Sequence, residues 1–535
     1  MRTLFFNGNI HTMNPDQPLA QAFLEEDGFL REIGGSELCR LPHDRQLDLA
    51  GQTVLPGMGD THLHLLHLGQ KLGGIDVTGA GSMEEIAHKV REFITCRHPA
   101  AGQWLDAQGF NQDLFAHRRI PHRQQLDEIT SEYPLVLTRI CGHLAVCNTL
   151  ALETLGITAQ TPQPPLGEFE IGEDGRPNGV FKEYAIELLQ QNRPAPSLEQ
   201  VKHWLLLAME HAASRGLTFV CSEDFETIPG CDYQMVMQAY HQLQNEGKMP
   251  LRVVQQCILP TMDKLNTFLR QGYRSGQGND WYRLGPLKLL SDGSLGARTA
   301  LLRQEYQDQP GEKGIGIYSA QQLTELVCTA HRAGMPVAVH AIGDGAIQRV
   351  LDAIQTAMEQ PGPAPRQPHG IIHCQITDAA LLDRICRMGV QVYAQPVFLE
   401  YDLHMAESRV GRQLASTSYA WRTLLEGGAK IAGGSDCPVE PLDPLLGIYC
   451  AASRMDFSGQ PEGGWNPAQR LTTQQAVELF TTRAAQAAGL ADCGSLRPGA
   501  CADFAVLSED PFTTPVSQLN KIRVHQTWCG GQRRY

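Results

Sequence analysis

The sequence predicts an α/β protein: a (β/α)8 TIM barrel with a small β-sandwich built from both termini and an inserted α/β lid domain. Three observations support this prediction. Apolar runs alternate with amphipathic stretches after about residue 216, a His-x-His pair follows an apolar run near residue 60, and the two ends of the chain are rich in short strands and turns. Such alternation of strands and helices is typical of parallel α/β folds.

The predicted barrel strands are short apolar runs. One precedes His62, and the others are residues 217–221, 251–258, 284–290, 336–340, 370–374, 390–394 and 429–433. Helical patterns lie between most of them, such as 320–333, 345–358 and 378–388. Apolar strands separated by helices imply a parallel sheet covered on both faces. Eight such repeats is the number that closes a TIM barrel.

A further strand-like run, residues 134–140, lies between the first and second barrel strands. The chain between those strands is far longer than one crossover needs. We therefore predict an inserted lid domain over residues 69–196, with a helix over 83–96 and a stretch rich in proline and glycine over 161–179.

The two ends of the chain are predicted to form one small domain. Residues before Pro56 have the pattern of short strands and turns, and a turn and a strand follow Gly494. Because chain termini often lie close together, we expect a β-sandwich over 1–55 and 489–535. The barrel is then predicted over 56–68 and 197–488.

Composition excludes several classes of protein. The 535 residues are enough for two or three domains, and 42% hydrophobic with 19% charged residues is ordinary for a globular protein. A net charge of -14 without a basic block disfavours nucleic acid as a partner. No signal peptide and no apolar run of membrane-spanning length is recognisable, so no membrane association is expected. The 15 scattered cysteines without a Cys-x-x-Cys pair predict a reduced, cytoplasmic chain.

Residues that bind metals follow the carboxyl ends of the predicted strands, where TIM-barrel active sites form. Residues two apart on a strand share a face, so His62 and His64 are expected to converge on one point. Neutral imidazole is the commonest metal-binding side chain. Further candidate ligands at the equivalent height are Lys288, His340, His373 and Asp436.

Lys288 has two interpretations. An ammonium group inside an apolar strand is costly unless it is paired or neutralised. It pairs with Asp292 or another carboxylate, or its neutral amine has captured carbon dioxide. The resulting carbamate has two oxygens and would bridge two divalent metals. The sequence leaves both interpretations open.

Several motifs resemble one family. They are Leu-Pro-Gly-Met-Gly-Asp-Thr-His-Leu-His at 55–64, Lys-Leu-Leu-Ser-Asp-Gly-Ser-Leu-Gly at 288–296, Val-His-Ala-Ile-Gly-Asp at 339–344 and Gly-Ser-Asp at 434–436. Together they resemble the amidohydrolase superfamily, and within it the YtcJ-like branch (amidohydrolase 3 type) that includes N-substituted formamide deformylases.

The resemblance implies a binuclear metal site. His62, His64 and Asp436 would hold one metal, His340 and His373 the other, and N6-carboxylated Lys288 would bridge them. The implied metal is most often zinc, although this donor set also suits iron, manganese or cobalt. Related barrels are often dimers, so a homodimer is compatible with the resemblance and the oligomeric state stays open.

These residues predict a metal-dependent amidohydrolase that cleaves a non-peptide C–N bond of a small-molecule amide or N-substituted formamide by metal-activated hydroxide. Asp436 would accept the proton of the attacking water and deliver it to the leaving amine. His143 either contacts the substrate from the lid or is satisfied by backbone within the inserted domain. The alternatives are a mononuclear deaminase-like enzyme, disfavoured because no Glu follows His340 closely, and a non-catalytic binding protein on the same barrel.

Overall fold

The computed structural model describes residues 1–165, 167–191, 193–361 and 364–535. The chain divides into two compact units: a barrel unit (Met1–Leu65, Ala208–Phe225 and Val236–Tyr535) and an insertion unit (Leu66–Leu207 and Glu226–Met235). Residue 166, within the predicted stretch 161–179, and residue 192, within the predicted lid domain, lie outside the described residues. The predicted division into three domains stays a prediction.

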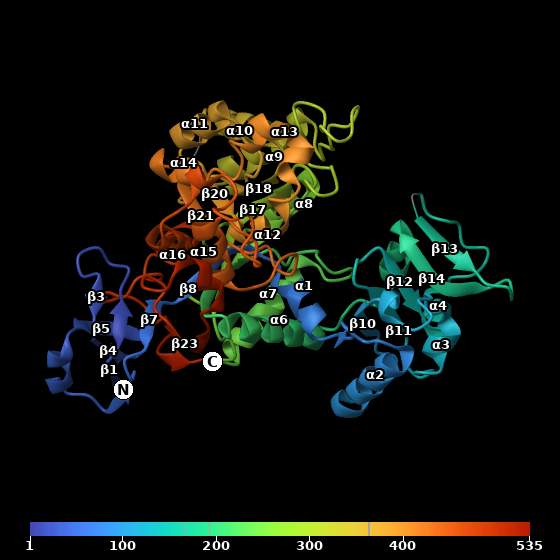
Figure 1. Ribbon diagram of the computed structural model, residues 1–535, viewed down its shortest axis with the longest axis horizontal. Coiled ribbons are helices and arrows are strands. Elements are labelled where there is room, and N and C mark those ends of the chain that lie inside the picture. The colour runs from blue at the N-terminus through green and yellow to red at the C-terminus, as the bar shows by residue number, and fades with distance from the viewer. Residues whose placement is uncertain (166, 192, 362–363) are drawn as a thin grey trace. The chain divides into compact units, whose positions relative to one another are not determined.

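Eight parallel strands form the sheet of the barrel unit, which confirms the predicted TIM barrel (Figure 1). The strands follow the chain in order around the sheet. They are β8 (Met58–Leu63), β15 (Leu217–Ser222), β16 (Arg252–Ile258), β17 (Tyr282–Leu290), β18 (Val337–Ala341), β19 (Gly370–His373), β20 (Gln391–Ala394) and β21 (Lys430–Gly433).

The first and last barrel strands meet at their carboxyl ends. The backbone N–H of Asp436 donates to the carbonyl of His62 at 2.8 Å, and the N–H of His64 donates to the carbonyl of Cys437 at 2.8 Å. The buried carboxylate of Asp60 accepts a hydrogen bond from the N–H of His62 at 3.0 Å. These backbone contacts hold three predicted metal-binding residues side by side.

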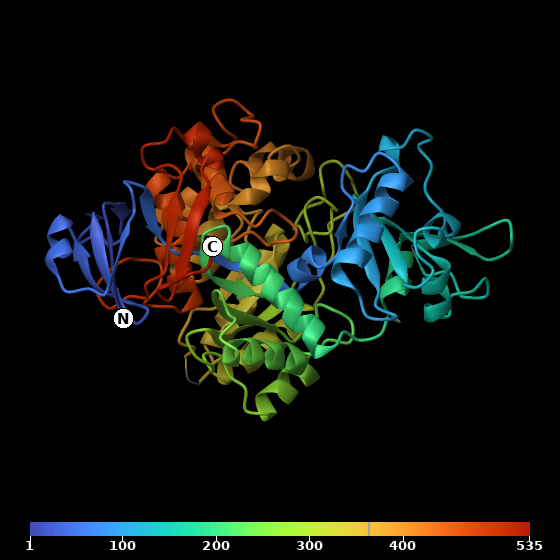
Figure 2. The same cartoon turned by 90° about the horizontal axis from the view of Figure 1, so that it is seen from below.

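Two sheets built from both ends of the chain pack face to face. Blue N-terminal strands lie beside red C-terminal strands in Figures 1 and 2. The rings of Phe5 and Phe23 lie 5.1 and 5.0 Å from the ring of Phe504. One sheet has the order β5-β4-β1-β6 and the other β24-β23-β22-β7-β2-β3. The strands are β1 (Arg2–Phe6), β2 (Asn9–His11), β3 (Leu19–Ala20), β4 (Ala22–Glu26), β5 (Phe29–Gly34), β6 (Arg45–Asp48), β7 (Thr53–Pro56), β22 (Phe504–Leu507), β23 (Val524–Cys529) and β24 (Gln532–Arg533).

The insertion unit contains a six-stranded mixed sheet. The predicted helix over 83–96 is α2 (Met83–Arg97), and the predicted strand over 134–140 is β11 (Leu135–Arg139). The other strands were not predicted, and several of them mix polar and apolar residues, such as β10 with the sequence Leu-Asp-Ala-Gln-Gly-Phe. They are β9 (Ile75–Asp76), β10 (Leu105–Phe110), β12 (Leu144–Cys147), β13 (Gly167–Ile171) and β14 (Pro177–Glu183).

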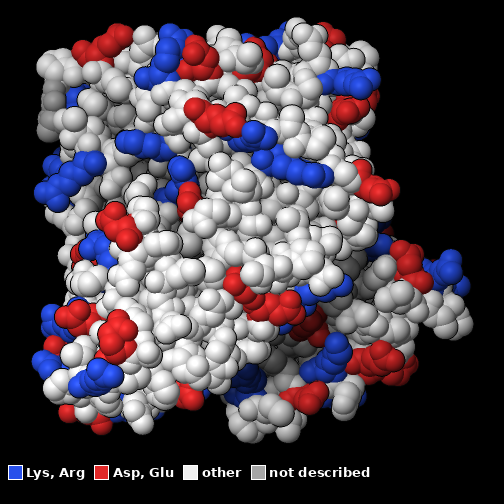
Figure 3. Space-filling view, turned by 60° about the vertical axis from the view of Figure 1, so that its left-hand side comes forward, with Lys and Arg blue, Asp and Glu red and all other residues white. Residues whose placement is uncertain are grey.

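The molecular surface carries mixed charge. On the face shown in Figure 3, Lys and Arg side chains are scattered among Asp and Glu side chains, as is typical of a solvated surface. Among the described residues, no helix combines the length and apolar character needed to cross a membrane.

The strand that leads to Asp436 is held by a close contact between glycines and one aromatic ring. The ring of Phe480, at the end of α16 (Thr473–Phe480), lies against Gly433 of β21 and Gly447 of α15 (Pro444–Ser453). A Cβ at Gly433 would lie 2.7 Å from the ring, and one at Gly447 would clash with it. Only glycine allows strand, helix and ring to approach so closely.

We expect Gly447→Ala to lower the free energy of unfolding, although alanine is the better helix former by about 1 kcal/mol. Overpacking against the Phe480 ring should cost about 1–3 kcal/mol. Urea denaturation measures the change, and the double variant Gly447→Ala/Phe480→Leu should recover part of the loss caused by the clash. A single variant as stable as the wild type would show that the contact is not restrictive.

Candidate metal centre

A set of metal-binding side chains converges at the carboxyl ends of the barrel strands. Asp436 Oδ1 lies 3.2 Å from His62 Nε2 and 3.0 Å from His64 Nε2. The ring centroid of His373 lies 5.8 Å from that of His62 and 4.4 Å from that of His340. The structure thus brings the predicted ligands together, and adds Glu223, which was not predicted to be a ligand.

The partner of Lys288 is Glu223. Lys288 Nζ lies 2.5 Å from Glu223 Oε2, and the two side chains are only 1% and 5% exposed. The same nitrogen lies 3.2 Å from His62 Nε2. Burial alone would raise the pKa of the Glu223 carboxyl, but Lys288 and His64 outweigh burial and lower it. Lys288 and Glu223 therefore form a buried ion pair.

Asp292, the other partner considered for Lys288, has a different role. Its carboxylate accepts hydrogen bonds from the backbone N–H groups of Leu301, Ile342 and Gly343 at 2.9, 3.1 and 2.9 Å. Burial raises the pKa of this carboxyl to about 7. Asp292 therefore organises the loop that follows His340.

Three of the imidazoles are held neutral. Burial, and then Lys288, lowers the pKa of His340 to about 4 and also lowers the pKa of His62. Burial, and then His340, keeps the pKa of His373 well below its usual value. A neutral imidazole has the free lone pair that a metal needs. Burial therefore keeps these rings in the metal-binding form near pH 7.

Hydrogen bonds from the other ring nitrogens decide which nitrogen faces the centre. His62 Nδ1 lies 2.6 Å from Gln256 Oε1, and the Gln256 amide is oriented because its NH2 group donates to the Thr61 carbonyl at 3.0 Å. His373 Nδ1 lies 2.8 Å from Gln395 Oε1, and the Gln395 amide donates to the Tyr393 carbonyl at 2.9 Å. In both rings Nδ1 therefore carries the hydrogen, and Nε2 keeps its lone pair.

His340 is oriented the opposite way. Its Nε2 lies 3.1 Å from the carbonyl oxygen of Gly293, which only accepts hydrogen bonds. The neutral ring therefore carries its hydrogen on Nε2 and keeps the lone pair on Nδ1.

The donor set fits a divalent cation. His62 Nε2, an acceptor, faces the oxygen of Asp436, also an acceptor. Burial alone would raise the pKa of Asp436, but the surrounding imidazoles outweigh it and hold that pKa well below its usual value. Lys288 Nζ, 3.2 Å from the same His62 nitrogen, is the positive group beside these acceptors. One atom each of His62, His373 and Asp436 lies within 4.8 Å of the others, as is true of His62, His64 and Glu223. Imidazole with carboxylate suits zinc, iron, manganese or cobalt.

The backbone is strained at two of these residues. His373 has φ of 75° and Asp436 has φ of 62°, both in the left-handed region that favours glycine. Such conformations cost about 1–3 kcal/mol each and are concentrated at functional sites. Contacts elsewhere in the barrel unit must therefore offset the free-energy cost of these two backbone conformations.

His143 lies in the insertion unit. Its side chain is 70% exposed, and Nδ1 lies 2.8 Å from Glu183 Oε2. The ring is therefore partnered by a carboxylate and not by backbone as the alternative interpretation had it. Its predicted contact with substrate stays a prediction.

Three residues of this site were not predicted from the sequence: Glu223, Gln256 and Gln395. Each is a polar residue inside or directly after an apolar strand, and each is buried. Buried polar groups need partners, so the position of these residues was the available signal. The position of these residues in the sequence did not identify their partners on other strands.

A sequence profile of the amidohydrolase family matches residues 45–535. The chain belongs to the amidohydrolase family. It is 32% identical to the amidohydrolase YtcJ of Bacillus subtilis (strain 168) over 543 residues, covering 100% of this chain and 99% of that protein. It is also 24% identical over 556 residues to the N-substituted formamide deformylase of Arthrobacter pascens, covering 99% and 98%.

Solved structures support the same class for this amidohydrolase. An uncharacterized metal-dependent hydrolase from Pyrococcus horikoshii OT3 superposes with a TM-score of 0.80 at 27% identity, covering 96% of this chain and 99% of that one. A similar hydrolase from Pyrococcus furiosus gives 0.79 at 28% identity, covering 96% and 100%. The amidohydrolase described here is thus a metal-dependent hydrolase.

We expect Gln395→Leu to weaken zinc binding by about 10–100-fold, because His373 loses the acceptor that fixes its hydrogen on Nδ1. Competition with a chromophoric chelator measures this affinity. Gln391→Leu is the matched control, since Gln391 is also buried, at the amino end of β20, and its amide donates to the Val392 carbonyl. Equal zinc affinity in both variants would remove Gln395 from the site.

Proposed function

We propose that this chain hydrolyses a C–N bond of a small-molecule amide or N-substituted formamide, using two zinc ions bridged by N6-carboxylated Lys288. The observation that carries the proposal is the convergence of the imidazoles of His62, His64 and His373 on the carboxylate of Asp436. The similarity to an N-substituted formamide deformylase supports the substrate class.

Divalent cations, when bound, supply Lewis acidity that lowers the pKa of water and polarises an amide carbonyl. His62, His64 and Asp436 would hold one ion, and His340 and His373 the other. Transfer of the proton from water to the leaving nitrogen is carried out by a side chain of the protein. Asp436, ionised and with a side chain only 10% exposed, accepts the proton of the attacking water and delivers it to the leaving nitrogen.

Glu223 has a role in forming the carbamate. The Lys288 ammonium first loses one proton to bulk water. The neutral Nζ then attacks the carbon of CO2, an N–C bond forms as one C–O π pair moves to oxygen, and the nitrogen releases its second proton. The Glu223 carboxylate, 2.5 Å from Nζ, accepts that proton. Without CO2 the same two groups form the buried ammonium–carboxylate pair. The pair is thus the resting form of the bridging ligand.

We expect Asp436→Asn to reduce amide hydrolysis by about 10²–10⁴-fold, the usual contribution of a positioned acid–base group. Turnover of an N-formyl amine library measures it, circular dichroism checks the fold, and metal analysis is run alongside because asparagine is a weaker ligand. Undiminished turnover would remove Asp436 from proton transfer.

We expect Lys288→Ala to lose the bridging group, so that less metal is retained and short carboxylates partly restore activity without bicarbonate. Wild-type protein with ¹³C-labelled bicarbonate should show a carbamate signal by NMR, and Glu223→Gln should form it more slowly. Two metal equivalents per chain agree with the proposal. One equivalent without a carbamate signal would favour the mononuclear alternative.

A further inference from the structure

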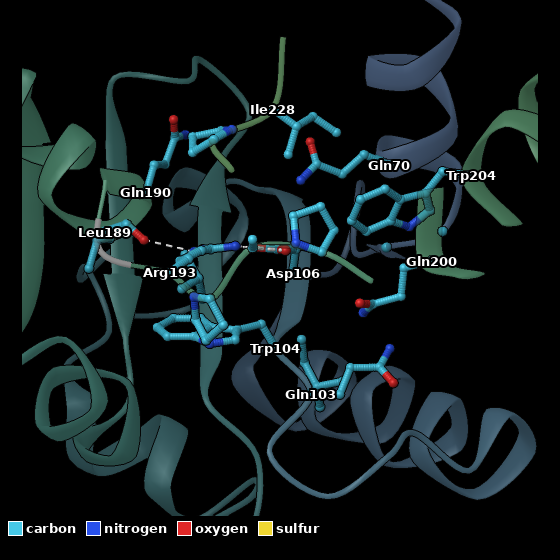
Figure 4. Close-up of a pocket in the computed structure, with 18 of the residues that line it drawn as sticks. Gln70, Gln103, Trp104, Asp106, Leu189, Gln190, Arg193, Gln200, Trp204 and Ile228 are labelled. Carbon is cyan, nitrogen blue, oxygen red and sulfur yellow. Dashed lines mark hydrogen bonds and ion pairs between the residues drawn. The ribbon is translucent and has the colours of Figure 1, made fainter. Parts of the chain in front are cut away.

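The insertion unit contains a cavity of about 610 Å³, and every residue that lines it belongs to this unit (Figure 4). The walls come from α1 (Leu65–Leu72), from the start of β10, from residues 186–190 and 193–197, from the first half of α6 (Leu198–Ala213) and from residues 227–229. Its volume is within the range of small-molecule sites. None of the metal-centre residues lines it, so it is a separate site.

The charged groups at the centre of the cavity neutralise each other. Arg193 Nη1 lies 2.9 Å from both carboxylate oxygens of Asp106. Arg193 Nε donates to the Leu189 carbonyl at 2.7 Å, and the guanidinium lies 4.5 Å from the ring centre of Trp104. Figure 4 shows this group in line with Asp106. A site with a fixed internal ion pair offers no net charge, which favours a neutral ligand.

Hydrogen-bonding groups around this pair are left without protein partners. The indole Nε1 of Trp104 is buried and unbonded. The amides of Gln70 and Gln190 have no hydrogen-bond partner among the described residues. The Gln200 carbonyl oxygen accepts from the Ser197 N–H at 2.9 Å, which leaves its NH2 group to donate. Among these groups only the Trp104 nitrogen is buried and so requires a partner, whereas Gln70 and Gln200 are half-buried and Gln190 is exposed. Together they would both donate to and accept from a ligand.

One aromatic face completes the cavity. Trp204 of α6 packs closely against Gly69 of α1 and against Gly73. A Cβ at Gly69 would clash with the Trp204 backbone, and a Cβ at Gly73 would lie 2.9 Å from the Trp204 ring. Arg193 already covers one face of the Trp104 ring. The cavity therefore offers the Trp204 indole, the Trp104 edge and a rim of carboxamides, as Figure 4 shows.

We propose that this cavity binds a neutral saccharide of one or two rings. The C–H face of a sugar ring is apolar and suits an indole, whereas its hydroxyls donate and accept and suit carboxamides, an indole N–H and a neutral Asp–Arg pair. A charged metabolite would leave its charge without a counter-charge in the site.

The metal-loaded full chain is titrated with maltose and cellobiose, and with glucuronate, glucosamine and nicotinamide as charged or aromatic comparators. Tryptophan fluorescence and saturation-transfer NMR follow binding. We expect a neutral disaccharide to bind, and the comparators to bind about tenfold more weakly or not at all.

Trp204→Ala and the milder Gln70→Leu should each raise the Kd for that disaccharide about tenfold or more. The matched control is Gln124→Leu, the same substitution at an exposed residue of α3 (Arg123–Asp127) in the insertion unit, and it should leave the Kd unchanged. Preference for nicotinamide or a charged sugar, unchanged Kd in Gln70→Leu, or no saccharide binding at millimolar concentration would each overturn the proposal.

Discussion

The arrangement of the metal centre depends on the buried contact between Lys288 and Glu223. Both side chains are excluded from water, and an isolated charge in that position would cost several kcal/mol. Burial, and then the neighbouring Lys288 at 3.2 Å, lowers the pKa of His62, so that ring stays neutral beside the pair. Lys288 also contributes to the low pKa of His340, after burial. One contact thus determines the protonation of the groups around it.

The barrel and the convergence of the candidate ligands were predictable from the sequence because both follow local rules. Each barrel strand is a short apolar run, and each predicted ligand stands at the carboxyl end of one of those runs. The parallel sheet then brings His62, His340 and Asp436 to the same edge without further information. Strand periodicity and strand order were sufficient for this part of the structure.

The remaining features depend on contacts between residues far apart in the chain, which sequence patterns do not encode. Gln256 and Gln395 orient imidazoles on other strands, and Glu223 pairs with a lysine two strands away. Asp292 was considered as a partner of Lys288 because it is close in sequence, but its carboxylate is occupied by backbone N–H groups. The sheet of the insertion unit was largely missed because several of its strands, such as β10 and β13, mix polar and apolar residues and so show no apolar run.

The meeting of the first and last barrel strands has a consequence for how the fold is maintained. His64 and Asp436 are 372 positions apart in the chain, yet their side chains touch where β8 and β21 come together. An ion held there would act as a cross-link between the first and last strands of the barrel. Loading the ion and locking the barrel are therefore one event, and chelation should loosen the fold as well as stop turnover.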